Sequence, residues 1–329
     1  MKLTALIILN FNNFEDTINC IESVERYNTA PIKYIVVDNG STRKEAAAAL
    51  DKYMSERFGA RYAKYHDGER VPAGVLPYAT LLVSETNYGY ARGNNKGLAL
   101  VQEDPTVDDI LILNNDILFI DDIIPELISI RDSLPDCGII SPLLLKRDCQ
   151  AIDYNCARRA IGVGDLVKSH LMHYFVRMCG STDEQFMRKR YLLLDPEVSR
   201  EGLLPIDLPS GSCMLIDKRL FQSIGFFDPG TFLYYEEDIL YRKLIEVGRN
   251  NYLAGNLRCI HLGAASTNQK STPVTLRANR ESERYYVRKF SGASKLMIFA
   301  HGISLRLFWL TLKLQKKVCP AGLTRKDYL

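Results

Sequence analysis

The sequence lacks the features that would place it outside the ordinary globular proteins. Its 42 basic and 39 acidic residues leave a net charge of only +3, so it has no basic excess of the kind that binds nucleic acid. Its eight cysteines include no Cys-x-x-Cys pair, which argues against a secreted disulfide framework and favours reduced thiols in a cytoplasmic chain. No uninterrupted apolar run is long enough for a membrane-spanning helix.

Two glycine-rich signatures are also missing from the first turn of the chain. The segment after the first apolar run reads Asn10-Phe11-Asn12-Asn13. A nicotinamide dehydrogenase needs Gly-x-Gly-x-x-Gly at this turn, and a nucleotidylyltransferase needs a glycine-rich basic loop there. The same segment offers no small-residue cleavage site, so residues 3–9 are interpreted as a buried strand rather than a signal sequence.

Apolar, β-rich runs alternate with helical patterns through the first half of the chain. This order predicts an α/β fold with a mostly parallel, Rossmann-like sheet and helices on both faces. Predicted strands cover residues 3–9, 32–37, 79–83 and 110–113, and predicted helices cover residues 14–24, 43–54 and 91–101. Residues 147–204 show no firm periodicity and are interpreted as a variable region rather than an independent domain.

Small polar residues follow all four predicted strands. They are Asn10-Phe11-Asn12, Asp38-Asn39-Gly40-Ser41, Asn87-Tyr88-Gly89 and Asn114-Asn115-Asp116. Each alone is an ordinary turn. Together they favour a binding site, because ligands of such sheets bind beyond the carboxyl ends of the strands.

Four stretches of the sequence resemble glycosyltransferase family 2, especially its rhamnosyltransferase-like branch. They are VVDNGST at 36–42, NYGYARGNNKG at 87–97, LNND at 113–116, and GSCMLI at 211–216 running on to Glu236-Glu237-Asp238. The resemblance covers about residues 3–265 and implies a GT-A fold. The expected organisation is a catalytic domain at 1–265, with a nucleotide half at 1–116 and an acceptor half at 117–265, followed by a C-terminal helical extension at 266–329.

The resemblance implies a nucleotide-diphosphate sugar as donor, with a dTDP- or UDP-sugar expected. The matching Asp38 would contact the nucleoside, and Asn10 and Asn12 are weaker candidates for the same base-and-ribose pocket. The alternative for Asp38 is an Asx-turn at the end of a strand.

The glycine-rich stretch 87–97 is a candidate phosphate site. Gly89 and Gly93 would let the backbone approach the diphosphate, and Arg92 would add a charge-assisted bond to phosphate. Asn87 and Asn115 are grouped with these donor-binding residues. The alternative is a turn followed by close packing of a helix.

Asp116 is the expected ligand of a divalent metal, Mg²⁺ or Mn²⁺. The family carries an Asp-x-Asp or a shortened variant after this strand, and here only the last residue of Asn114-Asn115-Asp116 is acidic. A hard cation takes oxygen ligands, so one carboxylate with phosphate oxygens and water would suffice. His261 matches a family histidine that reaches the metal or the diphosphate. The alternatives are a helix cap for Asp116 and a structural role for His261.

Glu237 is the expected general base, with Asp238 as the alternative if the alignment shifts by one residue. A base here would remove the proton from an acceptor hydroxyl. Acidic residues also suit a helix N-terminus on electrostatic grounds alone, which is the structural alternative.

The implied reaction is a single in-line displacement that inverts the anomeric centre. The expected acceptor is a glycan or lipid-linked intermediate of cell-surface polysaccharide synthesis. The competing hypotheses are a non-catalytic sugar-nucleotide-binding protein and a nucleotidylyltransferase.

The tail at 295–317 combines apolar, aromatic and basic residues. Arg306 near its centre disfavours a spanning helix, so an interfacial helix at the inner face of the plasma membrane is expected. The alternative is packing on the catalytic domain or on a partner in a homodimer.

Overall fold

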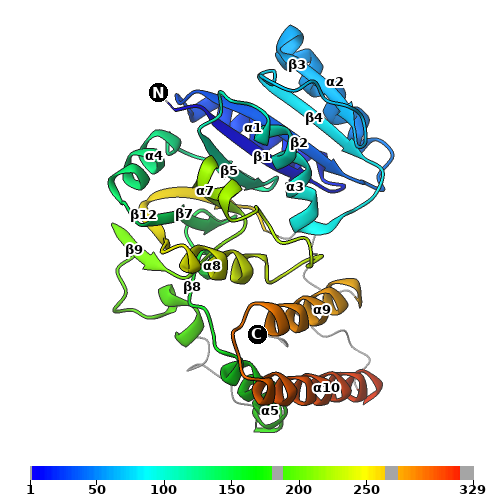
Figure 1. The fold of residues 1–329 in the computed structure, drawn as a ribbon, viewed down its shortest axis with the longest axis vertical. Helices are drawn as coiled ribbons and strands as arrows, with labels where there is room; N and C mark the ends of the chain where they lie inside the picture. Colours follow the sequence, from blue (N-terminus) through cyan, green and yellow to red (C-terminus); the bar gives the residue numbers. More distant parts are fainter. Residues whose placement is uncertain (1, 180–187, 264–272, 319–329) are drawn as a thin grey trace.

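The structure, a computed structural model, describes residues 2–179, 188–263 and 273–318, and the side chains of residues 2–172, 188–263 and 274–310. A large sheet with helices on both faces forms one part of the molecule (Figure 1). Below it lies a unit of three helices, α5 (Val163–Cys179), α9 (Pro273–Lys289) and α10 (Lys295–Val318).

The sheet combines strands from most of the described chain. Its strands are β1 (Thr4–Asn10), β2 (Ile32–Asn39), β3 (Tyr62–His66), β4 (Ala79–Ser84), β5 (Asp109–Asn114), β6 (Ile117–Phe119), β7 (Cys137–Lys146), β9 (Leu203–Ile206), β11 (Cys213–Asp217) and β12 (Asn250–His261). Their order is β3-β4-β2-β1-β5-β11-β7-β12-β6, with β9 paired to β12. Two short strands, β8 (Ala157–Arg158) and β10 (Leu208–Pro209), pair separately.

The first five strands of the sheet are parallel, as the sequence predicts. The register pairs Asn10 with Asp38, so the polar ends of β1 and β2 lie side by side. The predicted strands are confirmed with ends shifted by one or two residues. The edge strand β3 was not predicted, because its half-exposed residues lack a continuous apolar run.

The second half of the sheet brings distant segments to the end of β5. Strand β11 runs antiparallel to β5 and places Cys213 opposite Leu113. Strand β12 runs parallel to β7 and antiparallel to β6, with His261 opposite Ile117. Residues 210–212 and His261 therefore reach the same place as Asn114–Asp116.

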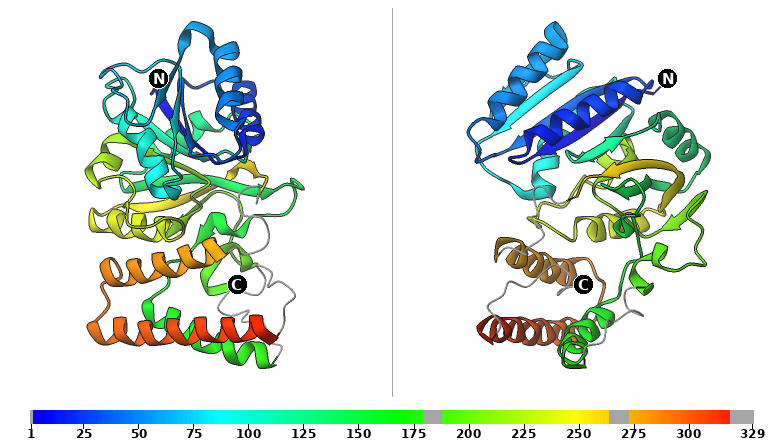
Figure 2. Two further views of the ribbon diagram at one scale, coloured as in Figure 1. Left: turned by 90° about the vertical axis from the view of Figure 1, so that its right-hand side faces the viewer. Right: turned by 180° about the vertical axis from the view of Figure 1, so that it is seen from behind.

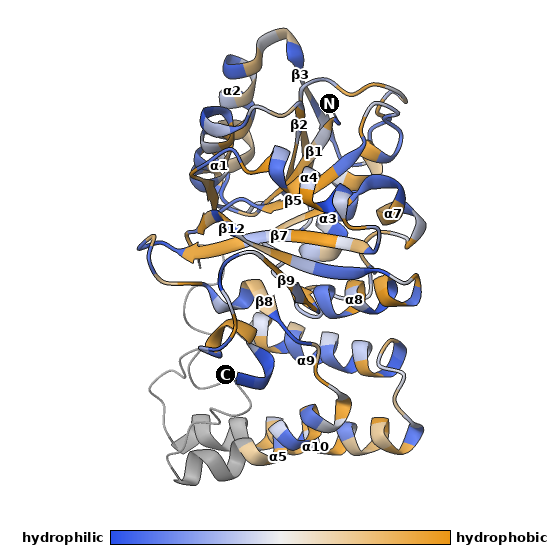
Figure 3. Cartoon of the chain, turned by 90° about the vertical axis from the view of Figure 1, so that its left-hand side faces the viewer, coloured by the Kyte–Doolittle hydropathy of each residue, from blue (hydrophilic) through white to orange (hydrophobic). Residues whose placement is uncertain are grey.

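Helices cover both faces of the sheet (Figure 2), and apolar residues of the strands and helices pack between these layers (Figure 3). One face is covered by α1 (Phe14–Tyr27), α2 (Ala46–Phe58) and α4 (Ile124–Ser133). The other is covered by α3 (Gly89–Gln102), α7 (Lys218–Ser223) and α8 (Glu236–Glu246). Most strand residues are buried on both sides, which explains their continuous apolar runs.

The three-helix unit draws on two separate parts of the chain. Helix α5 lies within residues 147–204, which show no firm periodicity in the sequence, and it packs against α10 of the tail. Ile239 of α8 packs with Tyr286 and Val287 of α9, which joins this unit to the sheet. The expected boundary between residues 265 and 266 lies outside the described residues. Among the described helices, none is long and apolar enough to cross a membrane.

Candidate functional site

The carboxyl ends of β1, β2 and β5 meet in a buried polar network. Nδ2 of Asn10 donates to Oδ1 of Asp38 over 2.7 Å. Thr17 Oγ1 donates to Asn10 Oδ1 at 3.0 Å, and Asn115 Nδ2 donates to Thr17 Oγ1 at 3.1 Å. Three residues expected to bind the donor, Asn10, Asp38 and Asn115, thus share one network.

Asn12 orders the loop beside this network. Its backbone has φ of 65°, and its Oδ1 accepts the N–H groups of Thr42 and Arg43 at 2.6 and 2.8 Å. Its own N–H donates to Ser41 Oγ at 2.8 Å. The structure gives Asn12 a loop-ordering role, and its contact with a nucleoside stays a prediction.

Asn87 and Gly89 connect the end of β2 to the segment that precedes α8. Gly89 N–H donates to Asn87 Oδ1 at 2.8 Å, and Gly89 C=O accepts from Asn39 Nδ2 at 3.0 Å. Gly89 has φ of 77°, and a Cβ added there would lie 2.1 Å from the carbonyl oxygen of Phe232. Glycine is required because two backbone segments pass this closely.

Arg92 binds a carbonyl group that the sequence did not predict, whereas Gly93 packs closely on the sheet, as the alternative interpretation of this stretch predicts. Nε of Arg92 donates to the carbonyl of Pro229 at 2.7 Å. A Cβ on Gly93 would lie 2.8 Å from Leu9 Cδ1 and 2.9 Å from Asn39 Nδ2. Gly93 therefore allows α3 to pack closely on the sheet, and its contact with phosphate stays a prediction.

Asp116 and His261 face one another at the end of β5. His261 Nε2 lies 3.4 Å from Asp116 Oδ1, and His261 Nδ1 lies 2.8 Å from Asp153 Oδ2. Because a carboxylate only accepts, Nδ1 must donate to Asp153, and the lone pair of a neutral His261 then faces Asp116. Burial alone would lower the pKa of His261, but the hydrogen bonds with Asp116 and Asp153 outweigh it and raise that pKa to about 10.

This pair fits a divalent cation. Either a proton or a metal ion is needed between Nε2 of His261 and the carboxylate of Asp116, since two lone pairs otherwise oppose each other. A carboxylate on the far nitrogen of a ligating histidine is a common supporting contact in metal sites. Asn155 Nδ2 holds the other oxygen of Asp153 at 2.8 Å, so the support is itself fixed.

Residues 210–212 connect this pair to the expected base. Ser212 Oγ lies 3.4 Å from His261 Nε2, and Ser212 C=O accepts from Asn114 N–H at 2.9 Å. The next residue back, Gly211, donates its N–H to Glu237 Oε1 at 3.0 Å. A Cβ on Gly211 would lie 2.9 Å from that same oxygen, so only glycine fits without displacement.

Glu237 and Asp238 differ in exposure. The side chain of Glu237 is 19 % exposed, and its Oε1 pairs with Nη2 of Arg158 at 3.3 Å as well as with Gly211. Asp238 is buried. Burial raises the pKa of its carboxyl, although the positive charges of Arg190 and Arg158 act to lower that pKa. Of the two candidates, only Glu237 combines partial exposure with a contact to residues 210–212.

Sequence reasoning missed Asp153, Arg158 and Ser212 as site residues. Ser212 lies in the family-like stretch at 211–216, so its motif was visible although its contact with His261 was not. Asp153 and Arg158 lie in the irregular region before α5, and no local pattern points to either.

The family comparison matches the first part of the chain. Residues 5–141 match the model of glycosyl transferase family 2. The chain is 26 % identical over 234 residues to the low-salt glycan biosynthesis hexosyltransferase Agl10 of Haloferax volcanii, covering 71 % of this chain and 58 % of that protein. The chain thus spans little more than half the length of that relative.

Two further similarities agree with this match. The chain is 25 % identical over 244 residues to an N-acetylglucosaminyl-diphospho-decaprenol L-rhamnosyltransferase of Mycobacterium tuberculosis, covering 72 % of this chain and 68 % of that protein. The crystal structure of GalNAc-T7 with UDP, GalNAc and Mn²⁺ superposes with a TM-score of 0.55 at 14 % identity, covering 95 % of this chain and 57 % of that one. Together with the parallel first half of the sheet, these similarities show that the chain has a GT-A fold and that residues 5–141 form a glycosyltransferase family 2 domain.

Proposed function

We propose that the chain is an inverting transferase that moves a sugar, with rhamnose as the first candidate, from a nucleotide-diphosphate donor to a hydroxyl. The acceptor in this proposal is a glycan or lipid-linked intermediate of cell-surface polysaccharide synthesis. Two similar proteins, a glycan hexosyltransferase and a diphospho-decaprenol rhamnosyltransferase, support this substrate class.

One observation carries the proposal. The segment 210–212 contacts the Asp116–His261 pair through Ser212 and the carboxylate of Glu237 through Gly211. A group that holds a leaving diphosphate and a group that accepts a proton are therefore fixed by adjacent residues. Displacement with inversion needs these two groups on opposite sides of the reacting carbon.

Each residue has a definite task in the proposed reaction. Glu237 takes the proton of the acceptor hydroxyl through Oε2, since Oε1 is engaged by Gly211 and Arg158. The acceptor oxygen bonds to the anomeric carbon as the bond from that carbon to the diphosphate breaks. Asp116 and His261 would hold Mg²⁺ or Mn²⁺, whose charge stabilises the leaving diphosphate. Asn10, Asp38 and Asn115 form the floor of the proposed nucleoside pocket.

The test separates chemistry from donor binding. Glu237→Gln keeps the size of the side chain and the acceptor for Gly211, so donor affinity should be preserved while turnover falls by about two to four powers of ten. Asp238→Asn, one residue along, is the matched control and should retain most turnover if it folds. Full transfer activity in Glu237→Gln would show that Glu237 is not the base. Donor binding without any transfer by the wild type would favour a non-catalytic sugar-nucleotide-binding protein.

We further propose that α10 contacts a membrane from the cytoplasmic side. Large apolar side chains are exposed along it at helical spacing: Leu296, Phe299, Ile303, Leu307 and Leu310. We call these five residues the α10 apolar stripe. The exposed Lys295 and Arg306 lie on the same helix and suit anionic lipid headgroups. A lipid-linked acceptor would lie at this surface, and a homodimer through the stripe is the competing occupant.

A further inference from the structure

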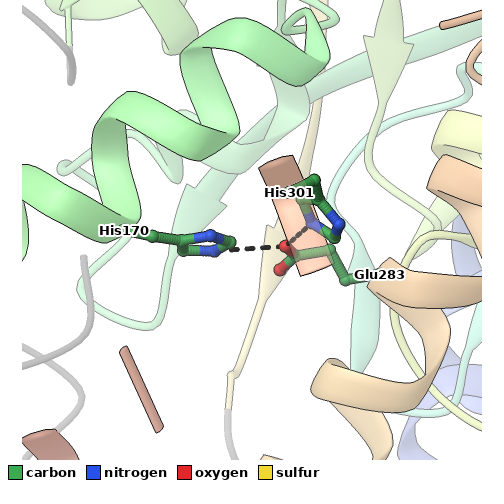
Figure 4. Close-up of side chains that lie close together, drawn as sticks. All are labelled: His170, Glu283 and His301. Atoms are coloured by element: carbon green, nitrogen blue, oxygen red, sulfur yellow. Dashed lines mark hydrogen bonds and ion pairs between the residues drawn. The ribbon is translucent and has the colours of Figure 1, made fainter. Parts of the chain in front are cut away.

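Three buried side chains meet where α5, α9 and α10 come together. They are His170 of α5, Glu283 of α9 and His301 of α10, which are 8, 5 and 2 % exposed. Figure 4 shows both imidazole rings directed at one carboxylate. Nε2 of His170 lies 3.1 Å and Nε2 of His301 lies 2.6 Å from the same oxygen, Oε1 of Glu283.

The hydrogen bonds around His170 fix which of its nitrogens carries a proton. The hydroxyl of Ser304 donates to the carbonyl of His301 at 3.0 Å, so that hydroxyl must accept the 3.1 Å bond from Nδ1 of His170. Nδ1 is therefore the protonated nitrogen of a neutral His170. Its Nε2 then presents a lone pair to the lone pairs of Glu283 Oε1.

A proton or a metal ion must therefore lie between Nε2 of His170 and Oε1 of Glu283. One carboxylate oxygen lies between two imidazole nitrogens in a site that excludes water, and opposed lone pairs there would be costly. The charge can be supplied by extra protons on the imidazoles or by a metal ion that all three side chains coordinate. One nitrogen or oxygen atom of each side chain lies within 4.8 Å of the other two, which is close enough for all three to bind a single ion.

The donor set indicates which ions fit. Two imidazole nitrogens with one carboxylate oxygen suit Zn²⁺ and related first-row dications, whereas Mg²⁺ and Ca²⁺ take oxygen ligands. Ser304 adds the second feature of such sites, a partner that holds the far nitrogen of a ligating histidine and sets its orientation. Ser304 is itself 2 % exposed, so this support is fully buried.

We propose that His170, Glu283 and His301 form a binding site for a zinc-type transition-metal dication, which joins α5, α9 and α10. This site is separate from the Asp116–His261 pair and does not depend on the proposed transfer reaction. Its role is structural, because each ligand comes from a different helix and the three helices come from two distant parts of the chain.

The site also supports the segment that begins α8. Helix α9, which carries Glu283, holds this segment through Ser282 Oγ, which donates to the carbonyl of Leu233 at 2.9 Å. The ring of Tyr286 packs on Tyr235 with centroids 5.4 Å apart. Tyr235 adopts φ of 68° immediately before Glu236. Metal binding should therefore stabilise the backbone that carries Glu237.

Cobalt provides a direct test on the full-length protein. The chain is stripped with chelator and titrated with Co²⁺ without nucleotide, and the visible d–d absorption is followed. We expect one equivalent of Co²⁺ to bind tightly and to give the strong absorption of a low-coordinate site with nitrogen and oxygen ligands. Added Zn²⁺ should displace the Co²⁺ and remove that absorption. The wild type alone can overturn the proposal, because a folded chain that gives no such absorption at excess Co²⁺ has no site of this kind.

Variants assign the absorption to residues. His170→Ala and Glu283→Gln should lower Co²⁺ affinity by about 100-fold or more, and Ser304→Ala by about 10- to 100-fold. His66→Ala, an exposed histidine on β3, is the matched control and should leave the absorption unchanged. Asp116→Asn should also leave it unchanged. Loss in Asp116→Asn with retention in His170→Ala would place the ion at the other pair and contradict the proposal.

The effect of Zn²⁺ on Tm provides a second test, which also applies to variants that fold poorly. Zn²⁺ should raise the Tm of the wild type and of His66→Ala, and it should raise the Tm of Ser304→Ala only at higher concentration. If Zn²⁺ leaves the wild-type Tm unchanged, protons rather than a metal ion supply the charge, and the proposal fails.

Discussion

The main-chain N–H of Gly211 donates a hydrogen bond of 3.0 Å to Oε1 of Glu237, 26 residues further along the chain. The same glycine accepts, through its carbonyl, a 2.6 Å bond from the hydroxyl of Tyr90. Glu237 is thus held by the backbone of a segment whose next residue, Ser212, approaches His261. This contact joins the two sides of the proposed reaction, and it can be tested without removing any functional group.

Gly211→Ala should lower turnover while leaving the fold intact. The added Cβ would lie 2.9 Å from Glu237 Oε1 and 2.9 Å from Tyr90 Oη, so the carboxylate must shift. A misplacement of about 1 Å in a catalytic group costs about 100-fold in rate, so kcat should fall by up to about that factor. Gly164→Ala, where an added Cβ meets nothing within 4 Å, is the control. Unchanged kcat in Gly211→Ala would show that the position of Glu237 does not matter to the reaction.

Asp153→Asn should weaken metal binding at the Asp116–His261 pair. The asparagine can turn its N–H₂ toward Nδ1 and release His261 from the tautomer that leaves Nε2 unprotonated. We expect Mn²⁺ affinity, measured by titration in the presence of a nucleoside diphosphate, to fall by about 10- to 100-fold. Asp148→Asn, an exposed neighbour in the same irregular region, should have no effect. Equal Mn²⁺ affinity in wild type and Asp153→Asn would remove His261 from the proposed ligands.

Glu236→Gln should remove a pH dependence of stability. Burial and the charge of Glu237 raise the pKa of Glu236 from 4.5 to about 8. The pKa of Glu236 is higher in the folded state than in the unfolded state. The contribution of this residue to stability is therefore fully present below about pH 4.5 and is lost as the pH rises toward 8. The wild-type Tm should therefore fall between pH 5 and 8 more steeply than that of Glu236→Gln. Glu281→Gln, at an exposed position, should follow the wild type. Identical slopes for all three proteins would mean that Glu236 is charged in the folded state.

Charges on the α10 apolar stripe should abolish binding to anionic membranes. The combined change Leu296→Glu, Phe299→Glu and Leu307→Glu alters side chains that are 78, 67 and 47 % exposed, so folding should be preserved. We expect co-sedimentation of the wild type with anionic liposomes and none for the triple variant. Val75→Glu, 67 % exposed, is the control. If neither protein binds lipid, and the wild type forms a dimer that the three substitutions dissociate, the stripe is a protein interface.

The fold of the first half follows directly from the sequence. Residues such as Leu6, Ile35 and Leu111 are buried on both faces of a parallel sheet, and this produces the continuous apolar runs that predict strands. Helix α5 escaped prediction because its polar His170 points into the three-helix unit, so its buried face is not purely apolar.

The candidate site was predictable only where a residue follows a strand or opens a helix. Asp38, Asp116 and Glu237 occupy such positions. The contact of His261 with Asp153 spans 108 residues and that with Ser212 spans 49, so tertiary pairing rather than local pattern creates them. The sequence left two interpretations open for Gly93, since helix packing and phosphate binding call for the same small residue.

The proposed function depends on the binding and use of a nucleotide-diphosphate sugar together with a divalent cation. A thermal-shift panel tests it most directly, with dTDP- and UDP-sugars, NAD and ATP, each with Mn²⁺ and again with chelator. We predict that a nucleotide sugar raises the Tm with Mn²⁺, that chelator abolishes the shift, and that Asp116→Asn shows none. Stabilisation by NAD or ATP with none from any nucleotide sugar, or a shift that is indifferent to chelator, would contradict this account.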